Sequence, residues 1–266
     1  TYIDGTQFVL PFFYSYTNMK SLTITPNNQR SETNSVFGSI DLDYKNVVFL
    51  TVTGRKDWFS TLNPSSNSIF YPSVGGSVLL SEVFKLPQVI KYMKLRGSWA
   101  QVGGAVPDAY AVNLTYSMMQ GGHNGRALEG VTSSTITDPN LRPLTSTTKE
   151  IGLETKLFNN RAGFDVTLYD RKTSDDIVQT AIPITSGYSY ARLNAGELQN
   201  KGIEVLVSGV PVKTRNLSWD VSYNMAYNES KVLKLTSGLN TIQMASSVGG
   251  WAGIYNEVGR PYGIIK

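Results

Sequence analysis

Few side chains in this 266-residue sequence have the types and spacing that catalysis or metal binding requires. His123 is the only histidine, so a catalytic triad or a zinc site would have to be built around it alone. The absence of cysteine removes thiolate ligands, thiol nucleophiles and disulfides. Asp175 with Asp176, and Asp41 with Asp43, could supply oxygen ligands, but neither pair has the loop spacing of a dedicated calcium site. We therefore expect no catalytic residue, no metal site and no cofactor.

Some residues could instead contact a ligand or a partner from loops. His123 lies in the glycine-rich string QGGHNGRALEG, and we expect it on a solvated loop, where binding residues concentrate. We expect four aromatic residues in outward-facing loops: Tyr188, Tyr190, Trp251 and Tyr255. Their rings could stack on sugar faces or pack against a partner protein, and packing among the loops themselves is the alternative.

The elements that position these residues are strands, as the string LSWDVSYNMAYN shows. In residues 217–228, apolar side chains from Leu217 to Tyr227 alternate with small or polar ones. Successive side chains of a strand point to opposite faces, so this strand has one apolar and one polar face. The pattern alone leaves open whether protein or lipid covers the apolar face.

The same alternation recurs along most of the chain, which favours an all-β fold. Strands are predicted at 34–44, 47–57, 68–80, 93–103, 148–157, 162–173, 198–209 and 217–228. One or two further strands are possible within 7–25, and a short helix is predicted around 81–92. The stretches 103–143 and 174–195 and the tail after Lys231 are predicted to be loops.

The second face of these strands carries charges of both signs. We predict that it faces a water-filled lumen, with these lumen-facing candidates: Arg55, Asp57, Lys94, Arg96, Glu150, Glu154 and Glu204. Phe37 is the one residue that looks misplaced, because its position belongs to the polar face. Ordinary strand composition is the alternative explanation of this pattern.

The lengths of the connections suggest a membrane barrel. Tight connections at 45–46, 159–161 and 210–216 alternate with longer ones at 58–68, 104–146 and 174–195. Outer-membrane barrels have this asymmetry, with short periplasmic turns and long outer loops. No apolar run approaches the roughly 18 residues of a membrane helix.

The net charge does not indicate a nucleic-acid partner. Lys and Arg exceed Asp and Glu by 24 − 20 = 4 and are scattered, so no nucleic-acid partner is expected.

Several strings resemble one known family in order and spacing: VFGSIDLDYKNVVFLTVTGRKDWFS, YPSVGGSVLLSEVF, MKLRGSWAQVGG, DPNLRP, TKEIGLETKLFNNRAGFDVTLYDRKTSDDI, LNAGELQNKGIEVLVSG and LSWDVSYNMAYNESKV. Between residue 34 and about 232 they are similar to the barrel of the SusC/RagA family, the TonB-linked outer-membrane nutrient transporters of Bacteroidetes. The strings GRKDWFS and LRPLTS depart from the family pattern, and both lie at strand ends or in loops.

The resemblance implies a 22-stranded barrel closed by an N-terminal plug, with a SusD-like surface lipoprotein as lid. Because only eight clear strands are predicted, we expect residues 1–266 to be part of the C-terminal barrel domain, with the plug and the TonB box absent from this chain. The implied partners are the SusD-like lipoprotein, TonB acting through the plug region, outer-membrane lipid and a glycan or peptide cargo. The implied function is TonB-dependent nutrient uptake, without enzymatic activity.

Two other functions remain open on the residues alone. One is a stand-alone small outer-membrane barrel with a structural or adhesion role, which would pair its first and last strands. The other is a soluble β-sandwich that binds carbohydrate, whose apolar faces would meet in a dry core.

Overall fold

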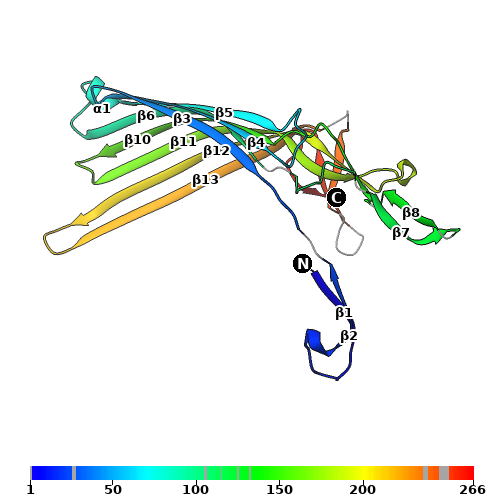
Figure 1. The fold of residues 1–266 in the computed structure, drawn as a ribbon. Coiled ribbons are helices and arrows are strands. Elements are labelled where there is room, and N and C mark those ends of the chain that lie inside the picture. Colours follow the sequence, from blue (N-terminus) through cyan, green and yellow to red (C-terminus); the bar gives the residue numbers. More distant parts are fainter. Residues whose placement is uncertain are drawn as a thin grey trace.

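The computed structural model describes residues 2–25, 28–104, 107–114, 116–124, 126–131, 133–235, 239–245 and 252–266. Strands dominate this part of the chain, and one strongly curved antiparallel sheet forms most of the molecule (Figure 1). The prediction of an all-β fold is therefore confirmed. Within the described ranges, no helix has the length and apolar character needed to cross a membrane.

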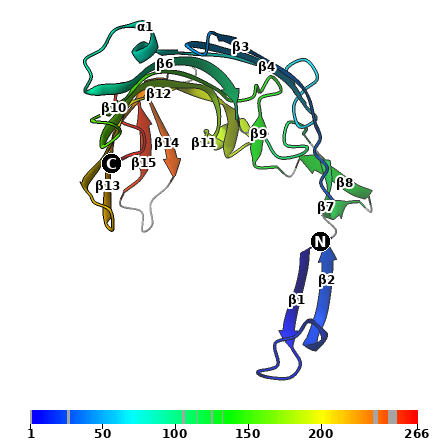
Figure 2. The same ribbon diagram turned by 90° about the vertical axis from the view of Figure 1, so that its left-hand side faces the viewer.

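The main sheet arches over a concave side (Figure 2). Its strands follow the order β13, β12, β11, β10, β6, β5, β4, β3, and β9 pairs in parallel with β12. These strands are β3 (Thr33–Tyr44), β4 (Val48–Phe59), β5 (Ser68–Leu79), β6 (Ile90–Gly103), β9 (Thr135–Thr137), β10 (Thr145–Leu157), β11 (Ala162–Ala181), β12 (Tyr190–Lys213) and β13 (Ser218–Lys234).

Smaller elements surround the arch. Two hairpins project from it, and a short sheet lies under it (Figures 1 and 2). They are the hairpin β1 (Tyr2–Phe8) and β2 (Met19–Thr25), the hairpin β7 (Tyr116–His123) and β8 (Arg126–Val131), and the sheet of β14 (Thr241–Ala245), β15 (Ile254–Glu257) and β16 (Ile264–Ile265). The helical segments are η1 (Tyr16–Asn18), α1 (Leu80–Val83) and η2 (Ile184–Ser186).

The connections separate by length between the two ends of the sheet. At one end, here called the turn end, residues 45–47, 158–161 and 214–217 connect neighbouring strands. The longer connections 60–67, 104–144 and 182–189 lie at the other end, here called the loop end. Backbone with positive φ makes the short turns possible, at Lys45 and Asn46 and again from Phe158 to Asn160. The predicted asymmetry holds for these six connections. Residues 80–89, which join β5 to β6 at the turn end and include α1, are an exception, because they are longer than 60–67 or 182–189.

Strand register places the two kinds of side chain on opposite faces. On the convex face, apolar side chains pair directly across strands, as in the run Leu153, Val166, Val205, Met225. This face stays largely uncovered, with Val36 67% and Tyr223 65% exposed. The predicted lumen-facing residues of these strands, such as Glu154 and Glu204, alternate with these apolar residues and therefore lie on the concave face.

The sequence prediction was wrong for the predicted helix and three predicted loops. The helix expected at 81–92 has only the four residues of α1, because Ile90 and Tyr92 already pair with β10. The stretch 174–195 is mostly strand, since β11 continues to Ala181 and β12 begins at Tyr190. The stretch 103–143 contains β7, β8 and β9, and the tail contains the sheet β14 to β16.

A small apolar core at the loop end explains why β11 and β12 continue so far. Val178, Val232, Leu235 and Ile242 are buried together, and Leu193, Leu198 and Met244 pack against them. Ile242 belongs to β14, which lies under the arch in Figure 2, so this core is on the concave side. Burial of these side chains offsets the entropy of ordering a longer hairpin.

The arrangement disfavours both alternative functions. In the described residues no second sheet covers the convex face, as a β-sandwich would require. The order of strands ends at β3 and β13, which do not pair with each other in the part of the chain that the structure describes, as they would in a small complete barrel.

Candidate functional site

The concave face brings the predicted lumen residues together on four strands, β4, β6, β10 and β12. In strand register, Glu154 of β10 lies directly opposite Lys94 of β6 and Asp165 of β11, so these three charged residues are side by side. Arg55 pairs with Tyr71 of β5, and Glu204 with Thr167 of β11. The register places all seven predicted residues on this face. That this face lines a water-filled lumen remains a prediction.

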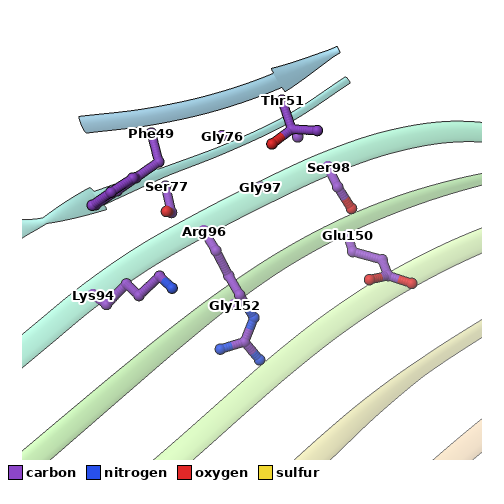
Figure 3. Close-up of a pocket in the computed structure, with 11 residues that line it drawn as sticks. Phe49, Thr51, Gly76, Ser77, Lys94, Arg96, Gly97, Ser98, Glu150 and Gly152 are labelled. Carbon is purple, nitrogen blue, oxygen red and sulfur yellow. The ribbon is translucent and has the colours of Figure 1, made fainter. Parts of the chain in front are cut away.

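The strongest interaction on this face crosses an entire strand. The Arg96 guanidinium on β6 donates two hydrogen bonds to the Asp165 carboxylate on β11, with N–O distances of 3.0 and 2.6 Å. It also donates to Thr167 at 2.6 Å. Strand β10 lies between these partners, and the side chain passes over Gly152 to reach them (Figure 3). This bidentate hydrogen bond between charged groups fixes the position of the guanidinium.

Gly152 makes this crossing possible. A Cβ built on Gly152 would lie only 2.7 Å from Arg96 Nε and 2.8 Å from its Cζ. Any larger residue would occupy the space through which the arginine passes.

A second crossing of the same kind lies two strands away. Tyr169 of β11 passes over Gly202 of β12 and donates from its hydroxyl to Asn228 Oδ1 of β13 at 3.0 Å. A Cβ on Gly202 would lie 2.5 Å from the tyrosine ring. Together the two crossings link β6, β11 and β13, and so span the part of the sheet from β6 to β13.

Of the residues that form these crossings, only Arg96 was among the predicted lumen-facing residues. Asp165, Tyr169 and Asn228 were not among the candidates, and neither glycine was read as part of a site. An isolated glycine inside a predicted strand indicates close approach of another group. That signal was present at Gly152 and Gly202 and could have identified both crossings.

Two pockets open on the concave face around these groups. One of about 280 Å³ lies over β4, β5, β6 and β10, and its lining mixes small and charged residues (Figure 3). Lys94, Arg96 and Glu150 contribute its charges. The other, of about 450 Å³, includes Arg55 and Asp57.

The Arg55 and Asp57 pair is held by its own contacts. Arg55 Nε donates to Asp57 Oδ1 at 2.7 Å, and its terminal nitrogen donates to Ser35 at 3.1 Å. Asp57 is 5% exposed although charged. Its burial is compatible with its charge because the guanidinium neutralises it directly.

The predicted loop residues do not form one site. His123 ends β7 and is exposed, whereas Tyr188 precedes β12 and Tyr190 begins it. Tyr255 is half-buried in β15, in a different sheet. Trp251 lies outside the described residues. Their roles in binding remain predictions.

The sheet that holds Tyr255 carries one strong ion pair. The Lys266 ammonium donates to the Glu257 carboxylate. This hydrogen bond lowers the pKa of the Glu257 carboxyl, so the pair persists until the pH falls below the ordinary range of a glutamate.

One segment at the loop end crosses between distant strands. Residues 138–144 leave β9 beside β12 and lead into β10, on the far side of β11. Asn194 accepts from the Arg142 backbone N–H at 2.9 Å and donates to the carbonyls of Arg142 and Asp175. Leu141 is fully buried, and Ser66 donates to its carbonyl. These contacts hold the segment against the end of the sheet.

The chemistry available on the concave face is binding and charge compensation. Three of its carboxylates form ion pairs, Asp57 with Arg55, Asp165 with Arg96 and Glu154 with Lys156. Among the described residues of this face, none is positioned as a nucleophile with an adjacent base. Within the described ranges, no three His, Asp or Glu side chains are grouped closely enough to hold a metal ion.

We expect Gly152→Ala to weaken the Arg96–Asp165 pair. The new methyl group would displace the guanidinium and, because both side chains are about one-third exposed, should cost only about 1 kcal/mol of stability. Unfolding in urea of the protein expressed from its complete reading frame would measure the loss. Gly75→Ala is the matched control, since its Cβ would meet only Ser98 at an ordinary 3.8 Å.

A double-mutant cycle tests the cause. If the loss comes from Arg96, Gly152→Ala should cost much less in an Arg96→Gln background. An equal loss in both backgrounds would contradict the proposed crossing.

Comparison with known proteins gives a consistent result. The chain matches the family described as TonB dependent receptor-like, beta-barrel, over residues 2–255. It is 30% identical to TonB-dependent receptor P26 of Formosa agariphila over 203 residues, which are 76% of this chain and 20% of that protein. It is 27% identical to TonB-dependent receptor SusC of Bacteroides thetaiotaomicron over 214 residues, which are 77% of this chain and 21% of SusC.

Among solved structures, the fold is similar to that of the RagAB peptide importer in its closed-closed state. The TM-score is 0.80 at 20% identity, covering 95% of this chain and 27% of the other. This likeness supports the fold of the curved sheet. The chain spans about a fifth of the length of the two curated relatives named above.

Proposed function

Because this chain belongs to the TonB dependent receptor-like β-barrel family, whose members are bacterial outer-membrane proteins, we propose that it forms part of the wall of a nutrient importer. The observation that carries the proposal is the division of one sheet into an apolar convex face and a charged concave face. Such a sheet separates hydrocarbon from water.

The open edges of the sheet support a larger barrel. Strands β3 and β13 each leave one row of backbone groups without a described partner strand. Unpaired edges cannot persist in lipid, where water is not available to bind them. We therefore assign residues 1–266 to the barrel domain of a longer receptor whose other strands pair with β3 and β13.

The proposed activity is transport without bond-breaking chemistry. Several charges of the concave face are compensated by partners on the same wall, as in the pair of Arg96 with Asp165. A polar solute can therefore pass without meeting a strong binding site that would retain it. TonB would supply the energy by acting on a plug region, and a SusD-like lipoprotein would cover the loop end.

The proposed cargo is an oligosaccharide or a peptide. Both are polar and too large for simple diffusion, and both suit a wall that mixes charges with hydroxyl groups. His123, Tyr188, Tyr190, Trp251 and Tyr255 are the proposed contacts with cargo or lipoprotein at the loop end.

An uptake experiment tests the function. Cells lacking the complete reading frame would be supplied with fluorescent oligosaccharides and fluorescent peptides in parallel. We expect one of the two classes to accumulate only in complemented cells, and to fall to the level of the deletion strain when TonB is removed or a protonophore is added. Equal accumulation with and without TonB would contradict the proposal.

A further inference from the structure

A group of lysines lies on the convex face, at the edge of the apolar surface nearest the loop end. In strand register, Lys149 pairs with Asp170, Asp170 with Lys201, and Lys201 with Glu229. One step closer to the loop end, Lys172 pairs with Gln199, and Gln199 with Lys231. We call Lys149, Lys172, Lys201 and Lys231 the convex lysine cluster.

The cluster is on the convex face because of its spacing from apolar residues. The row immediately toward the turn end pairs Ile151 with Leu168, Leu168 with Ile203, and Ile203 with Tyr227. Each charged residue of the first row is two positions from its apolar neighbour, so both point to the same side. The lysines therefore begin where the apolar surface ends, within about 7 Å along each strand.

Aromatic side chains mark the same boundary. Trp99 pairs with Lys149, and Tyr227 ends the apolar row on β13. Tryptophan and tyrosine concentrate where hydrocarbon meets lipid headgroups. In a bilayer the cluster would therefore lie at headgroup depth, in the leaflet at the loop end.

The cluster has more positive charge than its surroundings compensate. In these two rows four lysines face two carboxylates, Asp170 and Glu229, which leaves a surplus of 4 − 2 = 2 positive charges. In the next row Glu197 lies opposite Lys234, so that row leaves the surplus unchanged. Asp170 accepts from Gln199 at 2.8 and 3.1 Å and lies 3.8 Å from Lys201 Nζ. Among the described residues, Lys149, Lys172 and Lys231 have no carboxylate within 4.0 Å.

All four lysines are exposed, and their spacing suits one anionic group. The four strands β10 to β13 span about 14 Å at the usual strand separation. Lys149 and Lys201, and likewise Lys172 and Lys231, are two strands apart, which is about 10 Å. Their flexible side chains can therefore bring ammonium groups together on one phosphate.

We propose that the convex lysine cluster binds the phosphate group of a phosphorylated lipid. The acyl chains of the same molecule would lie along the apolar rows that include Leu168 and Ile203. This two-part contact distinguishes a lipid from a free phosphate ion, which would use the lysines alone. The proposal rests on the membrane placement of the proposed function and is independent of the cargo.

The test uses the protein from the complete reading frame, purified in neutral detergent. Binding of dioleoyl phosphatidic acid, dioleoylglycerol and inorganic phosphate would be measured by native mass spectrometry and by the shift in thermal unfolding. We expect phosphatidic acid to bind at least about tenfold more tightly than dioleoylglycerol, which has the same chains without the phosphate. Inorganic phosphate at equal concentration should produce no shift.

Two fourfold variants locate the site. Replacing Lys149, Lys172, Lys201 and Lys231 with glutamine should remove the preference for phosphatidic acid. Replacing four exposed turn-end lysines, Lys45, Lys85, Lys91 and Lys213, with glutamine should preserve it. Heat-dependent gel migration would confirm that both variants form barrels.

Three results would overturn the proposal. These are an unchanged preference in the first variant, a lost preference in the second, or an equal shift with inorganic phosphate. The uptake assay separates this proposal from the proposed function: if the unmodified protein showed no preference for phosphatidic acid but normal TonB-dependent uptake, only the lipid site would be rejected.

Discussion

Replacing Tyr223 with arginine is expected to prevent stable insertion into a bilayer, whereas arginine at the adjacent Asn224 should be tolerated. Tyr223 lies on the convex face of β13, in the middle of the alternating apolar residues from Trp219 to Tyr227, and is opposite Val207 of β12. An arginine near the middle of the hydrocarbon costs a transmembrane barrel about 2–4 kcal/mol. Asn224 lies on the concave face, where water can solvate the new charge.

Folding into lipid vesicles at graded urea concentrations would measure both variants in the complete protein. The matched positions are neighbours on one strand and receive the same new side chain, so the main difference between the variants is the face on which the charge lies. Equal loss of stability in the two variants would contradict the assignment of the convex face to lipid. A larger loss for Asn224→Arg would reverse it.

Gly196→Ala is expected to detach the loop-end extension of β11 and β12. Gly196 has φ +61, and a Cβ there would lie 1.9 Å from the Lys234 carbonyl oxygen. Because that oxygen belongs to the backbone, no side-chain rotation relieves the collision. We expect a loss of about 2–4 kcal/mol from steric overlap and backbone strain together.

Gly187→Ala is the control for backbone strain alone. Its φ is +86, but a Cβ there would meet no atom within 4 Å, so the loss should be about 1 kcal/mol. Urea unfolding gives both values, and proteolysis within residues 182–189 reports local opening. Equal sensitivity of the two variants would show that crowding at Gly196 is unimportant.

The central parts of the strands could be predicted from the sequence because their faces differ strongly. In β10 and β11, apolar residues such as Leu153 and Val166 alternate with charged ones such as Glu154 and Asp165. The observed register places Leu153 opposite Val166 and Glu154 opposite Asp165, which keeps the two kinds of residue on separate faces. Alternation also placed Phe37 on the polar face, and it is there, 80% exposed on the edge strand β3.

The loop-end extensions could not be predicted in this way. At Asp175 and Gly196 both strands adopt positive φ opposite each other, which interrupts the alternation. Beyond this point, Val178 and Leu193 are apolar because of a core formed with β13 and β14. Such long-range packing is absent from any local pattern.

The charged candidates could be assigned to a face, but their partners could not. Arg96 was expected on the polar face, whereas its bond to Asp165 depends on which strands are neighbours and on the missing side chain of Gly152. A local pattern contains neither fact.

The two glycine crossings have a mechanical consequence. Arg96 ties β6 to β11, and Tyr169 ties β11 to β13, in addition to the backbone ladders between adjacent strands. A force applied to any one of these strands is thereby shared with strands two places away. The five strands from β6 to β13 should therefore resist sliding past one another and move as one rigid unit. A domain inside the barrel could then be pulled past them without separating the strands.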